Sequence, residues 1–247
     1  MHPILFSIGR INVYSYGFVL AIAFLISLYL ASGRARIFKI PEEFINNLAL
    51  VLLVSGIIGA RTLYVFMNAG YFSKHFSEIF MIQRGGLVFY GAAIAAFFSG
   101  AVFIRIKRFS VLETSDLIAP FIALAHGMGR IGCFLNGCCY GRPTHSFIGV
   151  MFPFTDVKVY PTQIFSFVGL VILFLFLFNL QNRRRFNGEV FFSYLIGYGI
   201  FRFFIDFLRG DLYPVFLGLT VTQLISIAIA ITAGFAYLLA KKKSPLA

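Results

Sequence analysis

The chain has little charge, and acidic residues are its scarcest charged type. Only 12% of its 247 residues are charged, with 9 Asp or Glu against 21 Lys or Arg, while 60% are hydrophobic. A soluble core of this size could not bury so much apolar surface. The shortage of charge therefore excludes an ordinary soluble domain and indicates an integral membrane protein.

Several other features are missing. We find no low-complexity region, no convincing internal repeat, and no small-residue cleavage site after a short N-terminal apolar core. The first apolar stretch is therefore expected to remain as a spanning segment rather than to be removed as a signal peptide. Cysteine is limited to Cys133, Cys138 and Cys139, which stand in one segment and so say little about redox compartment.

Long apolar runs recur along the chain, and each approaches the roughly 20 residues that a helix needs to cross a bilayer. The predicted fold class is an all-α integral membrane protein with a single transmembrane domain over 1–247. We place its seven transmembrane helices at about 13–32, 44–66, 88–104, 115–133, 161–181, 188–207 and 221–240.

Basic residues are distributed unevenly between the loops. Twelve of the 21 follow alternate spans in groups of three, namely Arg34, Arg36 and Lys39; Arg105, Lys107 and Arg108; Arg183, Arg184 and Arg185; and Lys241, Lys242 and Lys243. Six others are spread over the remaining segments: Arg10, Lys74, Arg84, Arg142, Lys158 and Arg209. The positive-inside rule predicts an N-terminus outside and a cytoplasmic C-terminus, so the net charge of +12 reflects membrane topology and not nucleic acid.

Three arginines, Arg61, Arg130 and Arg202, fall inside the predicted spans. An arginine near mid-membrane costs at least about 2.5 kcal/mol, so it normally faces protein or water and finds a partner. Asp206, four residues after Arg202, could form an ion pair with it, but one acid cannot neutralise three cations. The excess charge near the outer leaflet favours a pocket for a phospholipid headgroup, because the guanidinium fork matches phosphate oxygens. The alternative is a purely structural network.

Two connecting regions allow local predictions. Phe and Ile recur at helical spacing in GYFSKHFSEIFMIQRGG, which predicts an interfacial amphipathic helix at about 70–82, with an irregular loop as the alternative. Thr114, Ser115 and Asp116 form a polar start that predicts the N-cap of the fourth span. A short periplasmic loop region is expected at about 134–160.

The glycine-rich run HGMGRIGCFLNGCCYGRPT, residues 126–144, predicts close helix approach and a turned backbone that lines a cavity. Its three cysteines leave a metal site, a disulfide between Cys133 and Cys138, or packed thiols as interpretations. The spacing does not match the usual C-x-x-C pairs of zinc sites, so we expect no metal and no cofactor.

The run GRIGCFLNGCCYGR resembles the signature of the prolipoprotein diacylglyceryl transferase family. Further blocks follow in family order over nearly the whole chain: SYG, GARTLYV, GGLVFYGA, SDLIAP, YPTQ and GYGIFRFFIDFLR. The resemblance implies an enzyme of the bacterial inner membrane that moves diacylglycerol from phosphatidylglycerol to the lipobox cysteine of preprolipoprotein signal peptides. A thioether forms, and glycerol-1-phosphate is released.

The resemblance also implies roles for particular residues. The catalytic residues would be Arg130 and Arg202, with Tyr90 as a proton relay, and the substrate-binding residues would be Tyr16, Arg61, Asn136, Gly141, Gln163, Asp206 and Arg209. The partners would be phosphatidylglycerol, the signal peptides and membrane lipids, with no nucleic acid.

Four positions depart from the family pattern. Tyr90 stands in place of a histidine, Cys133 in place of Asn, and Cys138 and Ser166 each in place of Glu. These departures leave open an inactive or repurposed phospholipid-binding relative. A lipid transporter is less favoured, because its sites should lie near the midplane between repeats.

Overall fold

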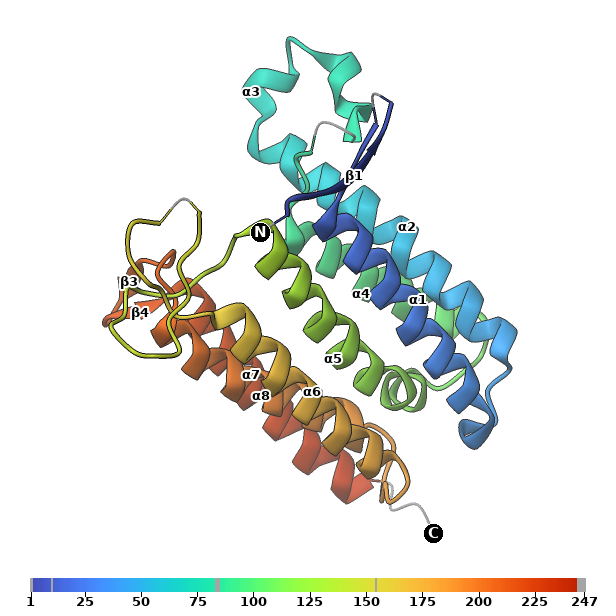
Figure 1. Ribbon diagram of the computed structural model, residues 1–247. Helices are drawn as coiled ribbons and strands as arrows, with labels where there is room; N and C mark the ends of the chain where they lie inside the picture. The colour runs from blue at the N-terminus through green and yellow to red at the C-terminus, as the bar shows by residue number, and fades with distance from the viewer. Residues whose placement is uncertain (1, 10, 83–84, 154, 244–247) are drawn as a thin grey trace. The chain divides into compact units, whose positions relative to one another are not determined.

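The structure is a computed structural model that describes residues 2–9, 11–82, 85–153 and 155–243. Arg10 and Arg84 of the charge count lie outside the described residues. Seven helices in the described part are long and apolar enough to cross a membrane (Figure 1). They are α1 (Ser15–Ala35), α2 (Glu42–Met67), α4 (Phe89–Ile106), α5 (Val111–Asn136), α6 (Thr162–Gln181), α7 (Glu189–Ile205) and α8 (Val221–Lys243). The predicted all-α membrane fold with seven spans is confirmed.

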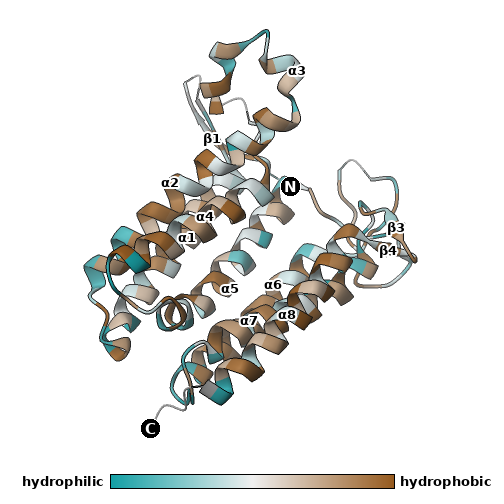
Figure 2. Cartoon of the chain, turned by 180° about the vertical axis from the view of Figure 1, so that it is seen from behind, coloured by the Kyte–Doolittle hydropathy of each residue, from teal (hydrophilic) through white to brown (hydrophobic). Residues whose placement is uncertain are grey.

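Hydrophobic residues predominate along these helices, and hydrophilic residues gather toward their ends and in the connections (Figure 2). In α4, for example, Ile94, Phe97 and Phe98 are 57%, 62% and 63% exposed. Such exposure would be unfavourable in water, whereas a helix in a bilayer needs an apolar surface toward lipid. The chain is therefore a multi-pass membrane protein.

Internal contacts divide the chain into two compact units. Unit 1 comprises Met1–Ala31 and Ser115–Ala247, and unit 2 comprises Ser32–Thr114. The sequence predicted one transmembrane domain without this subdivision, because seven similar apolar runs carry no signal for which helices pack together.

Unit 2 is built on the pairing of α2 with α4. Gly59 and Gly91 face each other, and a Cβ on either would collide with the backbone carbonyl of the other, so the two helices meet backbone to backbone. Nearer the ends of these helices, the ring of Phe44 stacks on Phe103 with centroids 5.5 Å apart.

The segment after α2 differs from its prediction. Instead of one continuous helix at about 70–82, it forms the four-residue helix α3 (Ala69–Phe72) and the 3-10 helix η2 (Phe76–Phe80). One physical reason is Arg61, whose guanidinium donates hydrogen bonds to the backbone carbonyls of Glu78 and Ile79, which a continuous helix would use for its own hydrogen bonds.

Unit 1 has a core where α5, α6 and α7 meet. It contains Ala119 and Ala123 of α5, Leu177 of α6, and Val190 and Tyr194 of α7. Two hairpins that the sequence did not predict complete the unit: β1 (Ile4–Ile8) with β2 (Ile11–Tyr14), and β3 (Pro214–Phe216) with β4 (Leu219–Thr220). The second hairpin turns through two residues with positive φ, as a type I′ turn requires.

The predicted N-cap at Thr114, Ser115 and Asp116 is wrong. α5 begins at Val111, and the hydroxyl of Ser110 accepts a hydrogen bond from the Glu113 amide at 3.3 Å. Asp116 instead caps α7, since its buried carboxylate accepts hydrogen bonds from the amides of Gly188 at 2.7 Å and Phe191 at 2.9 Å. A carboxylate at a helix N-terminus satisfies amides that lack a partner within the helix.

Candidate functional site

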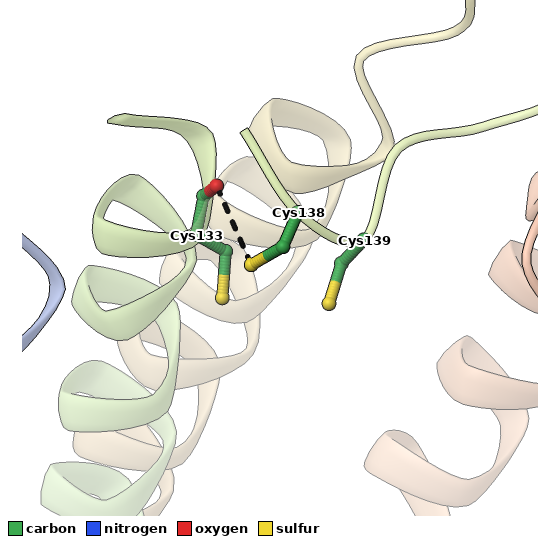
Figure 3. Close-up of side chains that lie close together, drawn as sticks. All are labelled: Cys133, Cys138 and Cys139. Carbon is green, nitrogen blue, oxygen red and sulfur yellow. Dashed lines mark hydrogen bonds between the residues drawn. The ribbon is translucent and has the colours of Figure 1, made fainter. Parts of the chain in front are cut away.

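The end of α5 gathers the three cysteines. The amide of Gly137 donates to the Phe134 carbonyl at 3.2 Å, and the amide of Cys138 donates to the Cys133 carbonyl at 3.1 Å. This pair of bonds defines a Schellman motif, which needs a left-handed residue at its turn, and Gly137 has φ 75°. The motif places Cys138 against Cys133. Cys139 follows with φ 64°, and the three sulfur atoms lie within 4.8 Å of one another (Figure 3).

The start of α6 holds this turn, residues 133–139, in place, and we refer to it as the cysteine turn. The hydroxyl of Thr162 donates to the Cys139 carbonyl, and Nε2 of Gln163 donates to the Cys138 carbonyl, both at 2.7 Å. Gln163 is only 1% exposed, and its Oε1 has no hydrogen-bond partner in the described part of the chain. Gln163, predicted to bind substrate, thus fixes the cysteine turn and keeps one free acceptor.

Gly141 brings the chain after the cysteines against the end of α7. Its amide donates to the Tyr160 carbonyl, and the next amide, of Arg142, donates to the Leu208 carbonyl, both at 2.8 Å. A Cβ at Gly141 would lie 2.6 Å from the Tyr160 Cβ and 2.7 Å from the Leu208 oxygen. Only glycine fits here, so this predicted site residue serves close backbone packing.

The predicted arginines of unit 1 have different partners. Arg130 donates from Nη2 to Nε2 of His126 at 2.8 Å. Arg202 pairs with Asp206 at 3.1 Å, and Arg209 holds Asp211 through two bonds of 2.7 and 2.5 Å. Arg130 makes no ion pair with any carboxylate among the described residues.

These three guanidinium groups share one region of unit 1. The charges of Arg130 and Arg202 both act on His126, and those of Arg209 and Arg130 act on Arg202. Two carboxylates, Asp206 and Asp211, accompany three cations. The region therefore keeps a positive charge. The sequence predicted such an excess from Arg61, Arg130 and Arg202, but in unit 1 Arg209 accompanies Arg130 and Arg202, and Arg61 belongs to unit 2.

Electrostatics also couple Arg209 to the cysteine turn. Burial alone would lower the pKa of Arg209, but its hydrogen bonds to Asp211 and the charge of the neighbouring Cys139 raise that pKa above its ordinary value. Hydrogen bonding with the neighbouring thiols of Cys133 and Cys138 lowers the pKa of Cys139, against the effect of burial, and the charges of Arg209 and Arg130 act in the same direction. The Cys139 sulfur is thus the one on which negative charge is best stabilised.

Tyr16 and Asn136 border the same turn. A Cβ at Gly132 would lie 3.3 Å from the Tyr16 Cα, so the start of α1 packs closely on α5 there. The Tyr16 phenol is near enough to Arg130 and the three thiols to interact with their charges. Asn136, the exposed last residue of α5, hydrogen-bonds to the Cys138 side chain.

Arg61 and Tyr90, the other two predicted site residues, belong to unit 2. Arg61 donates to the carbonyls of Glu78, Ile79, Gly85 and Gly86 at 2.5, 2.8, 2.8 and 3.2 Å. Tyr90 is 45% exposed, and its hydroxyl forms no hydrogen bond with a described residue. The geometry of Arg61 favours a role in holding the backbone at residues 78–79 and 85–86 over a role as a headgroup ligand.

A groove of about 550 Å³ runs along α2 and α4 in unit 2. Its lining includes Ile58, Leu63, Phe66 and Ile94, and no charged side chain contributes to it. Such a lining suits hydrocarbon rather than an anion. The cationic region of unit 1 and this apolar groove are thus chemically distinct surfaces.

Sequence reasoning missed two features of unit 1. It did not identify Thr162 as a contact of the cysteine turn, and it did not predict that the three thiols converge. A signal for the second was present, because a glycine four residues after Cys133 is typical of a helix that ends in a Schellman motif.

A family model described as prolipoprotein diacylglyceryl transferase matches residues 3–239. The chain belongs to this family. The phosphatidylglycerol–prolipoprotein diacylglyceryl transferase of Clostridium tetani is 36% identical over 242 residues, covering 96% of this chain and 97% of the relative. A second such relative, from Clostridium perfringens, is 37% identical with 98% and 97% covered, and one from Finegoldia magna is 36% identical with 94% and 92% covered. The resemblance read from the sequence is confirmed, and membership of this family makes the chain a membrane transferase.

Proposed function

We propose that this protein transfers the diacylglyceryl group of phosphatidylglycerol to the lipobox cysteine of preprolipoproteins in the bacterial cytoplasmic membrane. The relatives named for this donor and acceptor match along almost the entire chain. The grouping of basic residues supports an N-terminus outside and a C-terminus in the cytoplasm.

The reaction is a displacement at carbon. The acceptor thiolate attacks the glycerol carbon that carries the phosphate ester, the carbon–oxygen bond breaks, and glycerol-1-phosphate leaves with the electron pair. Negative charge grows on the departing phosphate, so the protein must supply positive charge in a site of low dielectric.

The observation that carries the proposal is the guanidinium of Arg130. It has a neutral histidine acceptor and no carboxylate among the described residues, so its charge remains available to a phosphate. Arg202 is oriented by Asp206, whose other oxygen accepts a hydrogen bond from Thr222 at 2.5 Å. We assign headgroup stabilisation to Arg130 and Arg202, with Arg209 contributing charge.

The other predicted contacts take supporting roles in this proposal. Tyr16 and Asn136 are polar groups at the border of the cationic region, available to the glycerol hydroxyls of the headgroup. Gln163 offers its free Oε1 as an acceptor. Arg61 maintains the backbone at residues 78–79 and 85–86 through its four bonds to carbonyls.

The proposal is tested with purified protein, phosphatidylglycerol vesicles and a synthetic lipobox peptide. We expect the peptide to gain the mass of a diacylglyceryl group while an equal amount of glycerol-1-phosphate is released. A peptide with serine in place of the lipobox cysteine is the matched control and should gain no mass. An unmodified cysteine peptide, from protein with a cooperative melting transition, would refute the proposed function.

A further inference from the structure

The cysteine turn, residues 133–139, brings together all three thiols of the sequence. Cys133, Cys138 and Cys139 are the only cysteines in the sequence, and their sulfur atoms lie within 4.8 Å of one another. In a tetrahedral zinc site, Zn–S bonds of about 2.3 Å put the sulfur atoms about 3.8 Å apart. The turn is therefore within about 1 Å of the spacing that one zinc ion requires.

We propose that Cys133, Cys138 and Cys139 bind a zinc ion whose fourth coordination position receives the thiol of the acceptor peptide. Three protein ligands with one open position is the arrangement of catalytic zinc, whereas structural sites are closed by four. The identity of the incoming thiol rests on the proposed function, but the metal site itself does not. The spacing of the cysteines along the sequence argued against zinc. That spacing does not show that the Schellman motif folds Cys138 back onto Cys133.

The local backbone orders the three thiols before any ion arrives. Gly137 and Cys139 both have positive φ, and for a residue with a side chain, such as Cys139, this conformation is strained. The strain is held by Thr162 and Gln163, which fix the carbonyls of Cys139 and Cys138 from α6. Packed thiols alone need no such arrangement, whereas metal ligands are normally oriented by hydrogen bonds around them.

Charge balance also favours the complex. A zinc ion with three thiolates carries a net charge of −1, and a fourth thiolate makes it −2. The charges of Arg209 and Arg130 both act on Cys139, so the anionic complex lies in a positive field. With neutral ligands the complex would keep the +2 charge of the ion, and the same positive field would destabilise it.

A zinc ion would promote removal of the proton from the acceptor thiol. Nε2 of His126, a candidate base in unit 1, already accepts a hydrogen bond from Arg130. A thiol that coordinates zinc is deprotonated outright, and its proton passes to water. The bound sulfur then attacks the glycerol carbon with its lone pair, and the breaking carbon–oxygen bond leaves its pair on glycerol-1-phosphate. The thioether product is neutral and is a weaker ligand than the thiolate, which favours its release.

Metal binding is tested first, without any transfer assay. Purified protein stripped with a chelator is reloaded with Zn²⁺, or with Co²⁺ as a spectroscopic probe. We expect one ion per chain and thiolate-to-cobalt charge-transfer bands, both lost in Cys139→Ser and Cys133→Ser. His75→Ala is the matched control, since His75 is an exposed potential ligand in unit 2 whose Nδ1 hydrogen-bonds to the Tyr71 carbonyl, and the variant should keep the full metal content. Folded protein without stoichiometric metal, or with two of the thiols in a disulfide, would overturn the proposal.

Transfer is then measured in the stripped and the reloaded protein. We expect transfer to fall at least about 100-fold on stripping, as for loss of a general base, and to return with Zn²⁺. Full transfer by metal-free protein would refute the part of the proposal in which zinc receives the acceptor thiol, and would leave the proposed function intact. Zinc-loaded protein that transfers nothing would refute the proposed function and leave the metal site intact. A melting curve for each serine variant separates loss of metal from loss of fold.

Discussion

Arg61 in unit 2 and Arg130 in unit 1 are both arginines within spanning helices, yet their guanidinium groups have different surroundings. Arg61 donates to four backbone carbonyls and lies 5.4 and 5.3 Å from the ring centroids of Tyr64 and Phe72. Arg130 has one acceptor, His126, among the described residues. A cation with saturated donors stabilises the protein around it, whereas one with spare donors can bind a ligand.

The glycines of the two units differ in the same way. Gly59 and Gly91 in unit 2 allow two straight helices to touch, and their effect is packing. Gly137 in unit 1 turns the chain sharply so that polar and sulfur side chains converge. Unit 2 therefore uses the family's residues mainly for architecture, and unit 1 uses them to assemble chemistry.

The largest expected effect comes from Arg130→Ala. Loss of one preorganised donor to a developing anion lowers turnover by about 10²–10³-fold, so transfer should fall by that factor. The melting temperature should stay close to that of the parent, because the side chain satisfies only His126. Transfer assays and melting curves on the same preparation check both statements. Normal transfer by this variant would remove the distinction between the two arginines.

Arg61→Ala is the matched variant and should behave in the reverse manner. Four carbonyls lose a charged donor, and such a loss destabilises by about 1.5–3 kcal/mol, so unit 2 should melt at a lower temperature. Hydrogen exchange should increase near residues 78–79 and 85–86, where the four carbonyl partners lie. Transfer measured well below the melting temperature should fall far less than in Arg130→Ala. A loss of transfer equal to that of Arg130→Ala, without a change in melting, would make Arg61 a headgroup ligand after all.

The sequence could predict the features that depend on composition and helical spacing. The seven spans follow from apolar runs of the right length, and the pair of Arg202 with Asp206 follows from a four-residue separation on one helix. These signals are local, and a membrane makes them strong because every spanning backbone must be helical.

Features that depend on distant partners could not be predicted in this way. Asp116 precedes an apolar run, which is typical of a cap on the same helix, but its partners belong to α7, 72 and 75 residues away. The helix expected at about 70–82 is interrupted where Arg61 takes carbonyls from a segment 17 to 25 residues further on. The cysteine site depends on two residues with positive φ, and one of them is not glycine.

The smallest expected effect is that of Tyr90→Phe in unit 2. A general base contributes about 10²–10⁴-fold to a rate, and we expect a loss far below this range. Tyr90 is 45% exposed, its hydroxyl has no hydrogen-bond partner among the described residues, and a phenol is a poor base near neutral pH. Transfer rates of the parent and Tyr90→Phe, each measured across neutral to mildly alkaline pH, provide the test. A modest and uniform decrease would leave Tyr90 a minor proton relay, and an unchanged rate would exclude the relay. A loss of two orders of magnitude would instead assign the base to unit 2, contradicting the division of roles between the units.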